Sequence, residues 1–95
     1  MTTHILNIER RWYDLLVSGD KTCEVRPNDR QFQRGDRLQF IDISGGDAAS
    51  ASAVSSRPLL PGVWEITHVL VGPCYGIETG HSVLSVHLRR DLESA

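Results

Sequence analysis

Lysine is nearly absent from this 95-residue chain: Lys21 is the only one among ten basic residues, and the other nine are arginines. No apolar run approaches the length of a membrane span, and the first residues have no basic-then-apolar signal layout. We therefore expect a cytoplasmic protein that does not bind membranes. Cys23 and Cys74 lack CxxC spacing, so in a reducing compartment we expect free thiols and no disulfide.

Sequence signatures of common catalytic and metal sites are missing as well. The chain contains no GxSxG, Walker or zinc-finger spacing, and its glycine-rich loop over residues 72–81 does not follow a strand and open a helix as a phosphate-binding loop does. The histidines have no cysteine or carboxylate partners at ligand spacing, which predicts structural roles and neither a metal nor a cofactor. They are His4, His68, His81 and His87.

Length and composition favour a single globular domain over residues 1–95. Hydrophobic residues make up 40% of the chain and charged residues 23%, which is ordinary for a soluble protein. The net charge of −2 excludes a polycation, yet seven of the ten basic residues lie between positions 10 and 37, interleaved with acidic ones. This pattern indicates planar guanidinium groups for local recognition, with weak long-range attraction to nucleic acid.

Hydrophobic periodicity predicts one helix and about five strands, an α+β arrangement in which a small curled sheet or barrel is covered by the helix. Gly19 stands where a helix C-cap needs a left-handed residue. Small residues dominate 44–61, which we expect to be a flexible insertion. The helix is expected over 9–18, and the strands over 4–8, 22–26, 37–43, 62–71 and 82–90.

Several residues are expected to anchor the core. Apolar spacing along the helix places Trp12 on its buried face, and Trp64 lies in a strong strand. Cys23 alternates with Val25, which predicts that both point inward on strand 22–26. Tyr75 in the glycine-rich loop is expected to be a loop anchor, with stacking on a base as the alternative. Phe32 is a further expected core anchor.

The stretch GDKTCEVRPNDR, residues 19–30, concentrates the polar chemistry of the chain. Glu24 and Arg26 are two apart on a strand, so their side chains leave the same face. Lys21 precedes that strand and can lean toward Glu24 or toward a bound anion. Asn28, Asp29 and Arg30 supply turn-forming and ligand-facing groups. The pattern alone favours an ion-pair network that closes the end of a barrel, with a ligand site as the alternative.

The spacing Gly19-x-Lys21-x-x-Glu24-x-Arg26 resembles the defining motif of the ASCH domain (activating signal cointegrator homology). The resemblance covers residues 4–43 well and 62–88 loosely, and beyond the motif it extends to a small prokaryotic and phage ASCH-like subfamily. Further matching elements are His4-x-Leu6, Asn28-Asp29-Arg30-x-Phe32, Gly35-Asp36-x-Leu38 and the closing SVLSVHL over 82–88.

This resemblance implies a PUA-like β-barrel whose cleft faces RNA, a nucleotide or a modified nucleoside. Lys21 and Arg26 would contact phosphate or a base edge, and Glu24 would orient them. Asn28 and Asp29 would complete the contact surface, and Arg30 and Arg10 would extend it to the nucleic-acid backbone. Arg10 lies in the first turn of the expected helix, where a cation opposes the helix dipole.

Two other functions stay open. Some ASCH proteins are amidases that act on acylated cytidine through a lysine, a threonine and a distant glutamate, and others are linked to RNA cleavage. Lys21 matches the lysine, but Glu24 stands at the threonine position, so Lys21 and Glu24 are the catalytic candidates of a metal-independent hydrolase. Thr22 is the nearby hydroxyl, and Glu65 and Glu78 are the distant carboxylates. The second alternative is a protein-interaction accessory domain.

Overall fold

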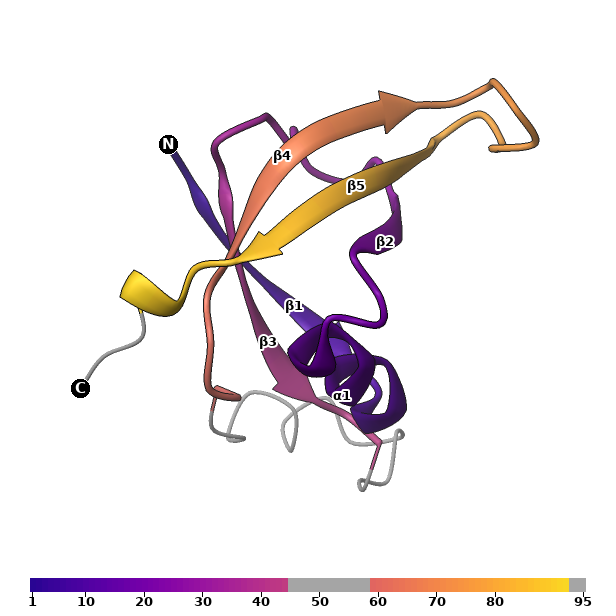
Figure 1. Ribbon diagram of the computed structural model, residues 1–95. Coiled ribbons are helices and arrows are strands. Elements are labelled where there is room, and N and C mark those ends of the chain that lie inside the picture. The colour runs from indigo at the N-terminus through magenta and orange to yellow at the C-terminus, as the bar shows by residue number, and fades with distance from the viewer. Residues whose placement is uncertain (45–58, 93–95) are drawn as a thin grey trace.

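The structure of the protein, a computed structural model, describes residues 1–44 and 59–92. Over these ranges the chain forms the expected single α-helix and five strands, together with a short 3-10 helix (Figure 1). No helix in the described ranges has the length and apolar character needed to cross a membrane. The elements are β1 (Thr3–Ile8), α1 (Arg10–Ser18), β2 (Cys23–Pro27), β3 (Arg37–Asp42), β4 (Trp64–Val71), β5 (His81–Leu88) and η1 (Arg90–Leu92).

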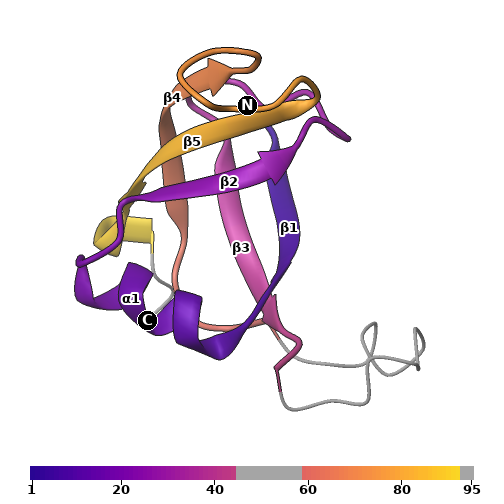
Figure 2. The same ribbon diagram turned by 90° about the vertical axis from the view of Figure 1, so that its right-hand side faces the viewer.

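The five strands form one sheet in the order β1-β3-β4-β5-β2, and the sheet curls into a half-barrel. β1 runs parallel to β3, whereas the β3–β4, β4–β5 and β5–β2 pairs are antiparallel. α1 lies across one end of the curled sheet (Figure 2). β1 and β2 follow each other in the sequence but occupy the two opposite edges. The expected α+β barrel-like fold is confirmed at this level.

The core lies inside the curl and is built by strand alternation. Leu38, Phe40, Ile66 and Leu84 are fully buried, and Trp64 is 2% exposed. Burying a side chain of this size stabilises the fold by about 1.5–3 kcal/mol. The prediction that Trp64 is a core residue is confirmed.

A buried polar pair fastens β1 to the turn before β3. His4 Nε2 lies 2.9 Å from Asp36 Oδ2, and the backbone N–H groups of Thr2 and Gln33 donate to the same carboxylate at 3.1 Å. Burial opposes ionisation of Asp36, but these hydrogen bonds outweigh it, so the pKa of Asp36 lies below its ordinary value. Phe32 packs edge-on against His4, with ring centroids 4.8 Å apart. The predicted structural role of His4 and the anchoring role of Phe32 are confirmed.

Helix α1 ends as predicted but presents a different face to the core. Gly19 adopts a left-handed φ of 86°, and its N–H donates to the Leu16 carbonyl at 3.3 Å. The prediction that Trp12 is buried is wrong, because 39% of this residue is exposed and Tyr13 is buried in its place. The reason is tertiary: the Tyr13 hydroxyl donates to the Pro61 carbonyl at 2.6 Å, which turns the tyrosine inward.

Strand β2 has the opposite orientation to the one predicted. Cys23 is exposed and Val25 is 57% exposed, whereas Glu24 is buried. The prediction that Cys23 lies in the core is therefore wrong. The carboxylate can point inward because two cations satisfy it, as described below, and the apolar side chains then face outward.

Most of the expected insertion over 44–61 lies outside the described residues. Its last residues return to the sheet: Leu59 forms a bridge with Ile41, and Leu60 N–H donates to the Phe40 carbonyl at 2.8 Å.

Farther along the chain, the β4–β5 hairpin extends beyond the rest of the sheet (Figure 1). Near its tip Tyr75 is 93% exposed with a φ of 46°, so its prediction as a loop anchor is wrong.

Candidate functional site

Glu24 is the centre of the charged stretch. Lys21 Nζ donates to Glu24 Oε1, and Arg26 Nε donates to Glu24 Oε2 at 3.0 Å. The side chain of Glu24 is 7% exposed, against 25% for Lys21 and 19% for Arg26. Each carboxylate oxygen thus has its own cationic partner, which offsets the cost of burying the charge.

Local structure explains how these three groups converge. The Lys21 N–H donates to the Leu15 carbonyl at 3.1 Å, which holds the corner between α1 and β2. Glu24 and Arg26 then leave the same, inward face of β2, because side chains two apart on a strand share a face. The spacing in the sequence therefore becomes one compact cluster of two cations and one carboxylate.

Two arginines also connect the free edges of the sheet. Arg26 Nη2 donates to the Asn7 carbonyl at 3.0 Å, and Arg30 Nη1 donates to the Ile5 carbonyl at 3.0 Å. Asn7 and Ile5 belong to β1, whereas Arg26 belongs to β2 and Arg30 follows it. We call the space between the edges of β1 and β2 the seam. Among the described residues, these side-chain contacts link its two sides.

Two shallow hollows open beside Glu24, and Trp12 and Val25 line both of them. The first, of about 240 Å³, also includes Asn7, Arg26 and Ile43, and we call it the Asn7 hollow. The second, of about 250 Å³, also includes Lys21 and Cys23, and we call it the Lys21 hollow.

The Trp12 ring lies under the guanidinium of Arg11, whose central carbon is 4.5 Å from the ring centroid. The Trp12 ring therefore already stacks against one planar group, the guanidinium of Arg11, at the surface of the protein. A larger hollow, of about 400 Å³, lies between residues 59–63 and Leu92. None of its lining residues is charged, so the Glu24 cluster is the stronger candidate site.

The other predicted site residues divide into two groups. Asn28 stabilises the end of β2: its side-chain oxygen accepts from Ser82 Oγ, and its N–H donates to the Gly80 carbonyl at 2.7 Å. Asp29 is exposed, and its carboxylate lies 3.9 Å from Arg30 Nε. Asn28 thus supports the fold locally, while Asp29 and Arg30 flank the seam.

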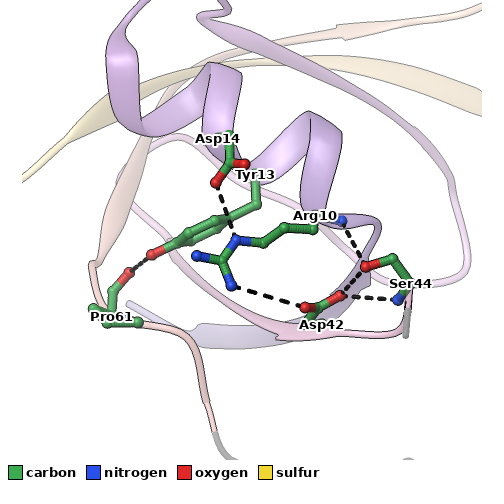
Figure 3. A network of polar contacts seen from close by, with 6 residues as sticks. All are labelled: Arg10, Tyr13, Asp14, Asp42, Ser44 and Pro61. Atoms are coloured by element: carbon green, nitrogen blue, oxygen red, sulfur yellow. Dashed lines mark hydrogen bonds and ion pairs between the residues drawn. The ribbon is translucent and has the colours of Figure 1, made fainter. Parts of the chain in front are cut away.

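Arg10 belongs to a separate network at the start of α1 (Figure 3). Its Nε donates to Asp14 at 3.0 Å, its Nη1 lies 4.0 Å from Asp42, and its guanidinium lies 5.5 Å from the centroid of the Tyr13 ring. The hydrogen bond and the charge of Asp14 raise the pKa of Arg10. The structure therefore does not bring Arg10 together with Lys21 and the two arginines of the seam.

The model of one protein family, described as domain of unknown function DUF3850, matches residues 3–86. The chain belongs to this family. The matched residues of the DUF3850 domain run from the first residue of β1 to Val86 in β5, so they include the seam and both hollows. No curated protein matches the chain significantly.

Two residues of the candidate site are not predicted by the sequence. Helical spacing predicts that Trp12 lies in the core, and no motif includes Asn7. The alternation of β1, in which His4, Leu6 and Ile8 are buried, would have placed Asn7 on the outward face. The exposure of Trp12 has no local signal, since it depends on which aromatic residue of α1 contacts Pro61.

The remaining catalytic candidates of the DUF3850 domain are not gathered around Lys21. Glu65 on β4 forms an ion pair with Arg89, and Thr22 is exposed, with its carbonyl accepting from the Val86 N–H at 2.9 Å. Within residues 1–44 and 59–92, no group of three or more His, Cys, Asp or Glu side chains is placed to hold a metal ion.

Proposed function

We propose that this DUF3850 domain is an ASCH-type, PUA-like module that binds RNA or a nucleotide at the seam. One observation carries the proposal: Lys21 and Arg26 converge on the buried Glu24 directly beside the exposed ring of Trp12. This combines a local excess of positive charge with an aromatic platform. Proteins that bind single-stranded nucleic acid combine the same two elements.

Each group has a defined part in this binding. Trp12 stacks on a base, a contact of about 1–3 kcal/mol in single-strand binding proteins. Lys21 and Arg26 contact phosphate oxygens or the acceptors of a base edge, and Glu24 holds both cations in place. Asn7, whose side chain lies on the exposed face of β1, adds a donor and an acceptor beside the ring.

The contacts of Lys21 favour binding over hydrolysis. A general base needs a free lone pair, whereas Lys21 Nζ forms an ion pair with the Glu24 carboxylate, and the ammonium nitrogen of an ion pair has no lone pair to accept a proton. A carboxylate at position 24 also replaces the hydroxyl that the amidase mechanism would use. Both features support a site that recognises a ligand without transforming it.

Titration with single-stranded RNA at several salt concentrations tests the proposal. We expect the logarithm of the binding constant to fall linearly with the logarithm of salt concentration, because bound phosphates release counterions. Lys21→Met should weaken binding, whereas Arg34→Gln, which removes a positive charge at an exposed turn, should have little effect. Binding that is absent, or that is independent of both Lys21 and salt, would refute the proposal.

Product analysis separates the binding module from the enzyme. The protein is incubated with N4-acetylcytidine and with single-stranded RNA, and the products are separated by chromatography. We expect both substrates to return intact. Product that forms with the wild type and disappears in Lys21→Ala would establish a hydrolase in place of a binding module.

A further inference from the structure

We infer that the seam binds two consecutive phosphates of an extended single strand, one at Arg26 and one at Arg30. The inference rests on the proposed function and narrows its ligand to an oligonucleotide, as opposed to a free nucleoside or a duplex. Four features support it: the spacing of the two guanidinium groups, their charge, their remaining donors and the position of Trp12.

The spacing comes from β1. The Asn7 and Ile5 carbonyls that hold Arg26 and Arg30 are two residues apart on one strand. Two residues of a strand span about 6.6 Å, which is close to the separation of neighbouring phosphates in a stretched single strand. The spacing of these two carbonyls on β1 therefore holds the two guanidinium groups about one nucleotide apart.

The charge of the seam is not cancelled. Lys21 and Arg26 share the single carboxylate of Glu24, and Arg30 lies 3.9 Å from the exposed Asp29. Glu9, which lines the Asn7 hollow, pairs with Arg11. Among the described residues, these four cations thus face three carboxylates. The main-chain carbonyls orient the guanidinium groups but carry no net charge, so they leave the attraction for an anion intact.

Each guanidinium keeps a donor for a ligand. In the hydrogen bonds formed among the described residues, Arg26 uses Nε and Nη2, and Arg30 uses Nη1. Arg26 Nη1 and Arg30 Nη2 take no part in these bonds. A guanidinium held on one side by protein can therefore present its other side to a phosphate oxygen.

The position of Trp12 selects a single strand. The ring lines the Asn7 hollow together with Arg26, so the nucleotide whose phosphate contacts Arg26 has its base within reach of the ring. A base inside a duplex is stacked between its neighbours and cannot stack on a side chain, whereas an unpaired base can. The two arginines then follow the backbone while Trp12 holds a base.

Neutralising one phosphate at a time tests the inference. The trinucleotides UpUpU and ApApA each contain two linkages, and either linkage can be replaced by an uncharged methylphosphonate. We expect each replacement to weaken binding to the wild type about tenfold, the effect of losing one hydrogen bond to a charged group. This comparison needs no variant of the protein and compares ligands of the same length and bases.

Variants then assign the linkages. In Arg30→Gln, one of the two methylphosphonate replacements should no longer weaken binding, while the other still does. In Arg34→Gln, both replacements should weaken binding as they do in the wild type. If both methylphosphonate replacements still weaken binding to Arg30→Gln, or if neither weakens binding to the wild type, the inference is wrong while the proposed function stands. If neither trinucleotide nor longer single-stranded RNA binds the wild type, the proposed function fails together with the inference.

Discussion

Replacing Glu24 with alanine tests whether the charged cluster stabilises the fold in addition to its proposed role in ligand binding. The carboxylate is almost completely buried, and both of its partners are more than two-thirds buried. Its removal leaves two cations without a counter-charge, and breaking a buried pair in this way costs about 3–5 kcal/mol. Arg26 still donates to the Asn7 carbonyl, so we expect the lower end of the range, about 3 kcal/mol.

Urea unfolding at neutral pH measures this loss by linear extrapolation. In a domain of this size about 1 kcal/mol corresponds to about 4–8 °C in melting temperature, so the thermal shift should be large. Asp29→Ala is the matched control: it removes a carboxylate that is 66% exposed and lies 3.9 Å from an arginine, so it should cost at most about 1 kcal/mol. Equal losses in the two variants would show that the cluster does not stabilise the fold.

Three further predictions follow from the same structure. Lys21→Met should change the free energy of unfolding by no more than about 1 kcal/mol, since Arg26 still pairs with Glu24, while RNA binding weakens; severe unfolding with unchanged binding would contradict this. Trp12→Ala should leave the melting temperature nearly unchanged but abolish the fluorescence change on RNA binding, because Trp64 is buried; a change that persists would place the ligand elsewhere. Asp36 has a lowered pKa, so its stabilising contribution is present above its unfolded pKa of about 3.9 and is lost as the pH falls through the lower folded value. Asp36→Asn should therefore show a smaller loss of stability than the wild type over that acid range in pH-dependent unfolding, and an identical profile would exclude this contribution.

The positions of the helix and strands could be predicted because their signals are local. Gly19 ends α1 through its own backbone conformation, and the alternation around Trp64 is contained in one strand. The orientation of β2 could not be predicted in the same way. Cys23 and Val25 form the more apolar face, yet Glu24 points inward because Arg26 reaches a carbonyl on β1, 19 residues earlier in the chain.

The candidate site shows the same division between local and distant causes. The grouping of Lys21 with Glu24 followed from spacing across one corner of the chain. The exposure of Trp12 did not, because it depends on a hydrogen bond between Tyr13 and a residue 48 positions later. The seam could not be predicted from the sequence either. It forms only when the sheet curls and brings the edges of β1 and β2 together, and these two strands share no sequence pattern.

The strand order has a consequence for protein synthesis. Among the described strands, β2 pairs with β5 alone, so residues 23–27 must wait for residues 81–88 before they join the sheet. A growing chain emerges from the ribosome N-terminus first, and until β5 appears Glu24 has no sheet to be buried in. A nascent chain that lacks β5 therefore cannot yet form the seam, and under the proposed function it has no binding site until residues 81–88 join the sheet.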